Sequence, residues 1–183
     1  MTFATLSTPR LLLKALSPED VKFIFENHPK AEIKKILGLR NEEDYLKEEH
    51  KHQNGYACYN RTFKRFLLID KTSGTIIGKC GFHNWNTDHN RAEVGYAMED
   101  ENYRRKGLMS EALDAVIAHG FAELKLHRIE ALVGINNTAS LRLMEKFGFV
   151  KEGSLREHYF INNKFEDSVV FSKLRSEYLN GKE

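Results

Sequence analysis

The chain has 183 residues, and its 41% hydrophobic and 30% charged content is typical of a globular protein with its own core. The net charge of +2 gives no overall attraction to nucleic acid, so we expect no nucleic-acid partner. No apolar run approaches the ~20 residues of a membrane helix, and the N-terminus lacks a signal-peptide pattern. We therefore expect one cytoplasmic domain over residues 1–183, with its core at about 8–174, a frayed tail at 180–183 and no membrane contact.

Cysteine and histidine usage gives no sign of a metal site. Cys58 and Cys80 lie in or beside apolar segments without metal-ligand spacing, so we expect free, buried thiols in a reducing compartment. No cysteine or carboxylate completes a ligand set around the paired histidines, which are His50, His52, His83 and His89. We expect no metal and surface positions for these histidines. A minor alternative places His83 and Trp85, which follow a predicted strand, beside an acceptor site.

The first part of the chain predicts a strand followed by helices. Thr8–Lys14 contains three consecutive leucines, which favour a strand. Ser17 suits the N-cap of a helix because a proline and two acidic residues follow it. Ala31–His52 predicts one or two short amphipathic helices that break near Gly38. Its charged end, Lys47–His52, is expected to face solvent or to form a mobile wall over a binding site.

The middle of the chain predicts an antiparallel meander. Phe66–Asp70 and Thr75–Phe82 are apolar runs joined by good turn residues, so they form a predicted hairpin. Asn84–Asn90 is expected to be a polar loop, and Arg91–Met98 alternates in the manner of a third strand. Short links between three consecutive strands favour antiparallel pairing.

The second half predicts strands alternating with helices. A helix should begin near Leu108, because apolar residues recur at helical spacing at Leu113, Val116, Ile117, Gly120, Phe121 and Leu124. Arg128–Val133 predicts a strand, and Asn137 suits the N-cap of a second helix, which Gly148 should end. Phe149–Tyr159 and Glu166–Leu174 predict a closing hairpin. The whole order indicates an α+β (mixed α/β) fold.

A basic, glycine-containing turn separates the strand at Arg91–Met98 from the helix at Leu108. Free backbone N–H groups and the helix dipole favour an anion at a helix N-terminus. Three cationic side chains precede Gly107, where the absence of a Cβ lets the backbone approach a ligand. The spacing differs from that of a P-loop and of a dinucleotide fold. We interpret Arg104–Met109 as a pyrophosphate cradle.

These pieces together resemble the Gcn5-related N-acetyltransferase (GNAT) superfamily. The resemblance is carried by Arg104-x-x-Gly107-x-Met109, by the preceding strand Ala92–Tyr96, by Asn137–Ser140 with Glu145–Phe149, and by Thr8–Leu13. It spans about 8–174 and is greatest to the branch of ribosomal-protein N-terminal acetyltransferases. The resemblance implies a mostly antiparallel twisted sheet of about seven strands, splayed in the middle and flanked by about four helices.

The resemblance also implies acetyl-CoA as the cosubstrate. By the family's pattern, the main chain of Tyr96, Ala97 and Met98 contacts pantetheine, and Asn137 reaches the pantetheine or the thioester. The residues that match the diphosphate cradle are Arg104, Arg105, Lys106, Gly107, Leu108 and Met109. Met109 departs from the family's usual small residue, so its side chain should turn away from the phosphates.

Two residues match catalytic positions of the family. Glu93 is either the base that deprotonates the acceptor amine or a sheet glutamate in an ion pair. The family's usual acid, a tyrosine, is replaced here by Met144. Ser140 either hydrogen-bonds the departing sulfur in its place or only caps its helix. A strand amide, of Met98 or a neighbour, is expected to polarise the thioester oxygen.

The resemblance therefore implies an enzyme, an acyltransferase that moves an acetyl group directly to a primary amine in a ternary complex. A protein N-terminal α-amine is the first choice of acceptor, by branch resemblance. The alternatives are a small-molecule amine, namely a polyamine, an amino acid or an aminoglycoside, and a non-catalytic acyl-CoA sensor. The protein is expected to act as a monomer or a homodimer.

Overall fold

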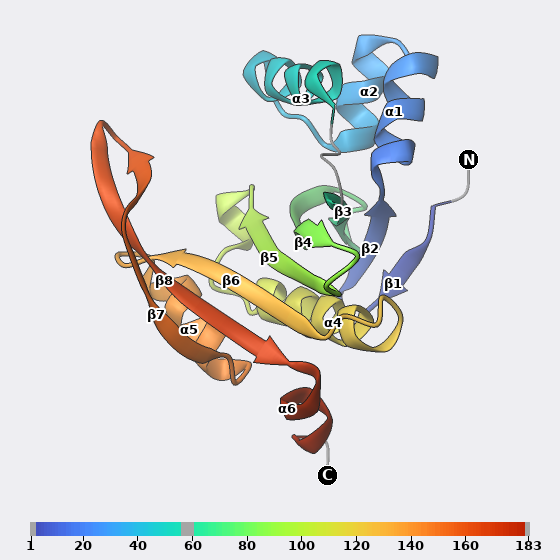
Figure 1. Cartoon of the computed structure of the whole chain (residues 1–183). Coiled ribbons are helices and arrows are strands. Elements are labelled where there is room, and N and C mark those ends of the chain that lie inside the picture. The colour runs from blue at the N-terminus through green and yellow to red at the C-terminus, as the bar shows by residue number, and fades with distance from the viewer. Residues whose placement is uncertain (1–2, 56–60, 182–183) are drawn as a thin grey trace.

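The computed structural model describes residues 3–55 and 61–181, and within them one eight-stranded sheet in the order β1-β2-β3-β4-β5-β6-β8-β7 (Figure 1). Only β5 and β6 pair in parallel; every other neighbouring pair is antiparallel. The strands are β1 (Thr5–Ser7), β2 (Leu11–Leu16), β3 (Arg61–Asp70), β4 (Ile76–Asn86), β5 (Arg91–Met98), β6 (Arg128–Gly134), β7 (Val150–Ile161) and β8 (Lys164–Leu174). This architecture is the expected α+β fold with a mostly antiparallel sheet.

Helices cover both faces of the sheet (Figure 1). They are α1 (Pro18–Asn27), α2 (Lys30–Leu37), α3 (Glu42–Asn54), a 3₁₀ turn at Glu101–Tyr103, α4 (Leu108–Ala122), α5 (Thr138–Lys146) and α6 (Arg175–Asn180). The first three pack together over β2 and β3, while α4 and α5 share a core on the opposite face. None of the helices described here has the length and apolar character needed to cross a membrane.

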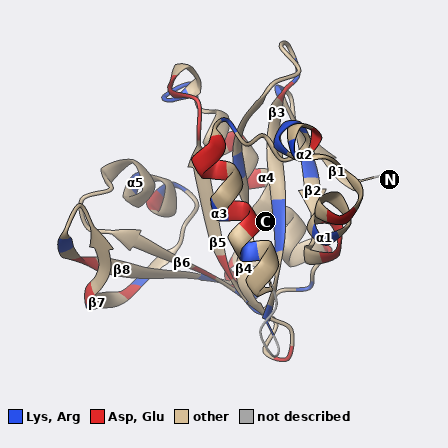
Figure 2. Cartoon of the chain, turned by 90° about the horizontal axis from the view of Figure 1, so that it is seen from above, with Lys and Arg blue, Asp and Glu red and all other residues tan. Residues whose placement is uncertain are grey.

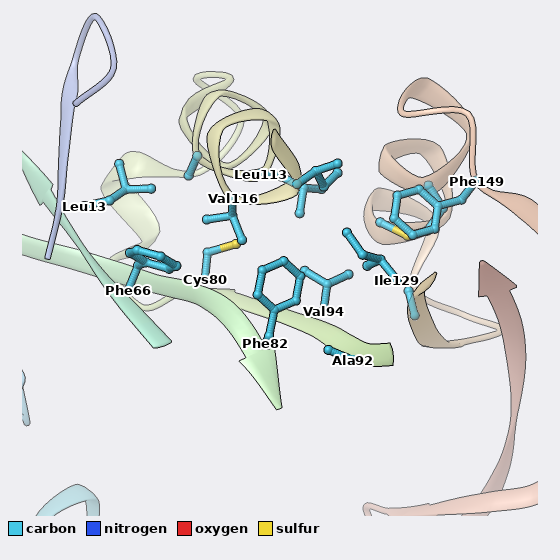
Figure 3. Packing of buried hydrophobic residues seen from close by; sticks show 14 of the residues in the cluster. Leu13, Phe66, Cys80, Phe82, Ala92, Val94, Leu113, Val116, Ile129 and Phe149 are labelled. Carbon is cyan, nitrogen blue, oxygen red and sulfur yellow. The ribbon is translucent and has the colours of Figure 1, made fainter. Parts of the chain in front are cut away.

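Alternation along β3 explains the two cores. Leu67 points into the cluster formed with α1–α3, whereas Phe66 and Leu68 point toward α4. Figure 3 shows the larger cluster, in which Phe82 and Val94 of the sheet meet Leu113 and Val116 of α4, with Ile129 and Phe149 nearer to α5. Cys80 belongs to the same cluster, as expected of a buried thiol, while Cys58 lies outside the described residues.

Local signals placed most helix ends correctly. Ser17 accepts a hydrogen bond from the Asp20 N–H, and the Asp20 carboxylate accepts one from the Ser17 N–H, which completes a capping box. Gly38 ends α2 in the left-handed conformation, at φ 68°. Asn137 caps α5 by accepting from the Ser140 N–H.

Several boundaries differ from the sequence-based prediction. The expected polar loop at Asn84–Asn90 is wrong in its first part, because β4 continues to Asn86, paired with a longer β3. The first predicted strand lies slightly later in the chain, at Leu11–Leu16. Two short elements, β1 and α6, escaped prediction because three and six residues carry too little periodicity.

The charged end of α3 is not simply a solvated surface. Glu48 is only 4% exposed, and its Oε1 accepts a hydrogen bond from Arg65 Nη2 at 2.6 Å. Lys51 Nζ lies 3.5 Å from Glu48 Oε2. The prediction that Lys47–His52 faces solvent is therefore wrong at Glu48, since its partner Arg65 lies on β3. This ion pair fixes α3 over the sheet.

The sheet opens between β5 and β6. The two strands pair only at Arg91–Glu93 with Arg128–Glu130, and beyond these positions no pairing is present. Figure 2 shows β6, β8 and β7 diverging from β5 on one side of the molecule. The expected splay in the middle of the sheet is confirmed, and it leaves the second half of β5 without a neighbour on that edge.

Close packing of α4 on β4 depends on Gly120. A Cβ at this position would lie 2.6 Å from Phe82 Cζ and 3.2 Å from Leu126 Cδ1. Gly120→Ala should therefore lower the free energy of unfolding by about 1–3 kcal/mol through overpacking, although alanine favours helices. Denaturant melts measure this loss.

Two variants control that measurement. A Cβ at Gly153 would have no neighbouring atom within 4 Å, so Gly153→Ala should change the free energy of unfolding by about 0.5 kcal/mol or less. Adding Phe82→Leu to Gly120→Ala should cost less than the sum of the two single changes. Strict additivity would contradict the proposed contact.

Candidate active site

The turn before α4 has a backbone suited to holding an anion. Gly107 is the N-cap of α4 at φ 75°, and Arg105 is also left-handed at φ 58°. Gly107 has no side chain to cap the helix, so the first N–H groups of the 15-residue α4 remain available. Left-handed residues in such a turn direct successive N–H groups to one side. The geometry at Arg104–Met109 thus has the features expected of a cradle.

Arg10 shapes this turn from a distant part of the chain. Its Nη1 donates to the Lys106 carbonyl at 2.9 Å, and its Nε donates to Glu111 Oε2 at 2.7 Å. Glu111 Oε1 also accepts from the Thr8 hydroxyl at 2.6 Å and from the Arg10 N–H at 2.8 Å. Burial alone would raise the pKa of the Glu111 carboxyl, but these hydrogen bonds and the charge of Arg10 outweigh it and lower the pKa. The first turn of α4 is therefore tied to the start of β2.

The three cations of the turn are not equivalent. Arg104 Nη1 is paired with Glu101 Oε1 at 2.9 Å. Lys106 Nζ lies 5.5 Å from the centre of the Tyr103 ring. Among the described residues, none forms a hydrogen bond or an ion pair with Arg105. Arg105 is therefore the side chain of the cradle with the most freedom to meet a phosphate.

A cavity of about 800 Å³ runs from this turn to the splay. Its lining includes the predicted cofactor residues Tyr96, Ala97, Met98, Arg104, Arg105, Gly107, Leu108, Met109 and Asn137, and also the predicted catalytic residue Ser140. Lys106 is absent from this lining. Met109 also packs against the core, as expected for a side chain that leaves the cradle to the backbone. The unpaired edge of β5 and the helix N-terminus thus border one elongated cavity, which fits an extended ligand with an anionic end.

A second cavity, of about 680 Å³, lies on the other side of the splay. It shares Tyr96, Asn137 and Ser140 with the first cavity, and so the two meet at these side chains. The Tyr96 hydroxyl is buried beside the Ser140 side chain, but no described residue meets the geometry of a hydrogen bond with it. Burial raises the pKa of Tyr96, while the neighbouring Ser140 side chain opposes this. A buried hydroxyl without a partner is costly, and it marks the junction as a place for a ligand.

Ser140 occupies the third position of α5. Its backbone N–H donates to Asn137 Oδ1 at 3.1 Å, so it is the backbone of Ser140 that takes part in capping. The side chain borders both cavities. Met144, at the position where a tyrosine is usual, is fully buried and offers no polar group.

Glu93 borders the second cavity together with His83. Its Oε1 lies 3.2 Å from His83 Nε2, and its Oε2 accepts from Asn84 Nδ2 at 3.0 Å. Burial alone would raise the pKa of Glu93, but the hydrogen bond and charge of His83, then Asn84 and the charge of His158, lower it below the ordinary carboxyl value. Glu93 is thus both an ion-pair partner and a cavity residue.

A third, smaller cavity of about 400 Å³ lies between α3 and the sheet. It shares His83, Gly95 and Tyr96 with the second cavity, and it includes Lys51 and Arg65, which pair with Glu48. The second and third cavities therefore adjoin at these shared residues.

Some residues of the site escaped the sequence-based prediction. The sequence gives Arg10 only as part of a resemblance and Tyr159 only as part of a strand, whereas Tyr159 borders the second cavity. The sequence favours a surface position for His83, with an acceptor role as the minor alternative, and the structure places His83 at two cavities. Trp85 packs against the core, and the second and third cavities do not include it. Within the described ranges, no group of three His, Cys, Asp or Glu is placed to hold a metal ion.

The sequence is similar to those of known acetyltransferases. The sequence model of the acetyltransferase (GNAT) domain matches residues 10–150. The chain is 35% identical over 171 residues to the uncharacterized N-acetyltransferase YoaA of Bacillus subtilis, covering 93% of this chain and 96% of that protein. It is 28% identical over 123 residues to the ribosomal-protein-serine acetyltransferase of Escherichia coli, covering 67% of this chain and 64% of that protein.

The fold is also shared with solved structures. The spermidine/spermine N-acetyltransferase SpeG of Vibrio cholerae superposes with a TM-score of 0.70 at 25% identity, covering 95% of this chain and 98% of that one. The cradle, the splay and the cavities described above therefore sit in a fold that acetyltransferases use.

The contacts of Arg10 generate a test of the cradle. Arg10→Met should weaken coenzyme A binding about tenfold or more, because a hydrogen bond to a charged group contributes ~1.5–3 kcal/mol. It also leaves the Glu111 carboxylate without its cation beside the anion site. Titration calorimetry measures the affinity.

Arg61→Met, an exposed arginine at the start of β3, is the matched control and should leave the affinity unchanged. Equal affinities for the wild type and Arg10→Met would show that the Arg10 contacts do not shape the binding turn.

Proposed function

The chain belongs to the acetyltransferase (GNAT) family, and we propose that it transfers the acetyl group of acetyl-CoA to a protein N-terminal α-amine. The observation that carries the proposal is the meeting of two cavities at the splay, one leading from an anion cradle and one from the opposite face. Donor and acceptor can then reach the same point from opposite sides without displacing each other.

On the donor side, the main-chain amides at the N-terminus of α4 and the Arg105 guanidinium would hold the diphosphate. The main chain of Tyr96–Met98 pairs with β4 on one edge, and its open edge would hydrogen-bond the pantetheine arm in the way a neighbouring strand would. Asn137, at the junction of the cavities, would reach the thioester end. The first amides of α4 and the Arg105 side chain have no hydrogen-bond partner among the described residues, whereas Asn137 Oδ1 also caps α5.

On the acceptor side, the chemistry favours an α-amine. Such an amine has a pKa of about 7.7–8.0, against about 10.4 for lysine, so it is far more easily deprotonated near neutral pH. Glu93 and Glu166 border the second cavity and would attract the ammonium form. The remainder of the acceptor would extend past Lys51, Arg65 and Lys79 in the third cavity. Neutral or acidic peptide residues suit that lining better than the further cations of a polyamine.

The transfer would be direct. Glu93 would take part in removing the proton from the acceptor ammonium. Ser140 would hydrogen-bond the sulfur as it leaves. The Met98 amide or a neighbouring strand amide would polarise the carbonyl oxygen. Burial raises the pKa of the Cys80 thiol to about 12, so this cysteine is a poor nucleophile at neutral pH. That property supports transfer in a ternary complex, without an acyl-cysteine intermediate.

A small-molecule amine is the second candidate acceptor. The observation in its favour is the likeness to the Vibrio cholerae spermidine/spermine enzyme, over 95% of this chain. Against it stands the lining of the third cavity, which includes Lys51, Arg65 and Lys79, each ion-paired with Glu48 or Glu99, and, among the described residues, no carboxylate. The two candidates differ in what the acceptor carries beyond its reactive amine, and so a panel of amines separates them.

Thiol release from acetyl-CoA tests the proposal. Peptides with a free N-terminal serine or alanine should be acetylated, and the same peptides blocked at the N-terminus should be inert because they lack the α-amine. We expect kcat/KM for spermidine to be at least tenfold lower than for the best free peptide. Mass spectrometry should locate the acetyl group on the α-nitrogen.

A higher kcat/KM for spermidine than for every peptide would replace the proposed acceptor with the small-molecule alternative. Binding of coenzyme A without turnover of any amine would instead indicate a sensor.

A further inference from the structure

We propose that His83 is the base that takes the proton from the acceptor amine, and that Glu93 acts through His83 as a positioning residue. This inference deepens the proposed function and rests on it. The imidazole of His83 would contact the acceptor amine and take its proton, and the carboxylate of Glu93 would orient the imidazole.

The register of the sheet brings the two side chains together. His83 of β4 lies directly opposite Glu93 of β5, so both side chains emerge on the same face. His83 Nε2 is 3.2 Å from Glu93 Oε1, and Asn84 Nδ2 holds the other carboxylate oxygen at 3.0 Å. A carboxylate oxygen this close to Nε2 favours the tautomer with the proton on Nε2, which leaves the lone pair on Nδ1.

Gly95 makes room for the imidazole. A Cβ at this position would lie 2.8 Å from His83 Cε1 and 3.1 Å from His83 Nδ1, so any other residue would displace the ring. With glycine there, the ring lies across β5 where the second and third cavities meet. The His83 side chain is 48% exposed, and no described residue forms a hydrogen bond with Nδ1. An acceptor entering from either cavity therefore meets the imidazole.

Glu93 is less suited to take the proton itself. Its side chain is 14% exposed, against 48% for His83, and both of its oxygens already have partners. His83 and Asn84 lower its pKa despite burial, which makes it a weak base near neutral pH. An imidazole is the side chain best matched to proton transfer in that range.

Other ionisable groups surround the pair. Those that line the second and third cavities with it, or act on Glu93 by charge, are Lys51, Arg65, Lys79, Cys80, Tyr96, His158, Tyr159 and Glu166. Lys51 and Arg65 are paired with Glu48, and Lys79 with Glu99. Glu93 is the charged group in direct contact with His83.

The proton and electron balance is simple. The acceptor ammonium loses one proton to Nδ1 of His83, which becomes an imidazolium stabilised by the Glu93 carboxylate. The freed lone pair of the amine forms the nitrogen–carbon bond to the acetyl carbon, and the carbonyl electron pair moves onto oxygen. The nitrogen then loses its second proton. When the carbonyl re-forms, the carbon–sulfur bond breaks, its electron pair leaves with the sulfur, and the thiolate takes up one proton, which balances the second proton lost by the nitrogen. The imidazolium returns its proton to solvent, so no oxidant or metal is needed.

Three variants test the division of roles with a free N-terminal peptide as acceptor. His83→Gln should lower kcat/KM about a hundredfold, as is usual when a general base is removed. Glu93→Gln should lower it about tenfold, because the imidazole remains. The double variant should resemble His83→Gln alone, since both side chains act as a unit. His89→Gln, an exposed histidine in the β4–β5 turn, is the matched control and should match the wild type.

The pH dependence distinguishes a base from a merely structural histidine. The ratio of wild-type to His83→Gln kcat/KM should fall as the pH is lowered from about 8 to about 5, because a protonated imidazole cannot accept a proton. The ionisation of the acceptor amine affects both proteins equally and cancels in the ratio. A ratio that stays constant with pH would overturn the proposal.

A titration without acetyl-CoA gives an independent readout. In His83→Gln, the Glu93 carboxyl loses the imidazolium charge, so its pKa should rise from the lowered wild-type value. Carbon-13 NMR of the carboxyl group measures this shift, and an unchanged Glu93 titration would contradict the contact.

The outcomes separate this inference from the proposed function. Full turnover by His83→Gln, or a larger loss in Glu93→Gln than in His83→Gln, overturns the assignment while leaving the acetyltransferase activity intact. Absence of turnover by the wild-type protein with every amine overturns the proposed function itself. Coenzyme A affinity should be the same in all variants, because neither side chain borders the cofactor cavity.

Discussion

The structure depends on the parting of β5 and β6. Two parallel strands that pair at only three positions leave the following backbone groups of β5 without sheet partners on one edge. Backbone N–H and C=O groups away from water need partners, and here a ligand rather than the protein can supply them. The same opening lets cavities from opposite faces meet at Tyr96, Asn137 and Ser140. In the proposed function, cofactor binding and acetyl transfer both depend on one interruption of an otherwise continuous sheet.

The surrounding contacts hold that opening in place. Gly120 lets α4 approach β4 closely, and the Arg10–Glu111 contacts fasten the first turn of α4 to β2. On the other face, the Glu48–Arg65 pair fixes α3 beside the acceptor approach. Because these links join elements far apart in the sequence, the cradle and the acceptor side keep a fixed relation to each other. Such preorganisation reduces the cost of bringing two substrates together.

The sequence predicted the features that local chemistry determines. Ser17, Gly38 and Asn137 mark helix ends through their own hydrogen bonds or conformation, and Gly107 marks the cradle in the same way. The resemblance to a family extended these signals to the splay. Arg10 and Glu111 are 101 positions apart in the sequence, so no local sequence pattern predicts their pairing.

The contact of His83 with Glu93 depends on the register of β4 and β5, and the expected loop at Asn84–Asn90 concealed that register. The acceptor cavities likewise depend on how α3 lies on β3, which one sequence does not encode in any local pattern. Local signals thus predicted the turn before α4 and the cap of α5, which form the proposed donor side, whereas the proposed acceptor side depends on tertiary pairing.

The central claim is that main-chain amides at the start of α4 hold the diphosphate of coenzyme A. Amide chemical shifts, measured by NMR with coenzyme A and with pantetheine, which lacks the diphosphate, test it most directly. The account predicts that Tyr96–Met98 respond to both ligands, whereas Arg105–Met109 respond strongly only to coenzyme A. Equal responses at Arg105–Met109, or the largest changes at a remote surface, would contradict it.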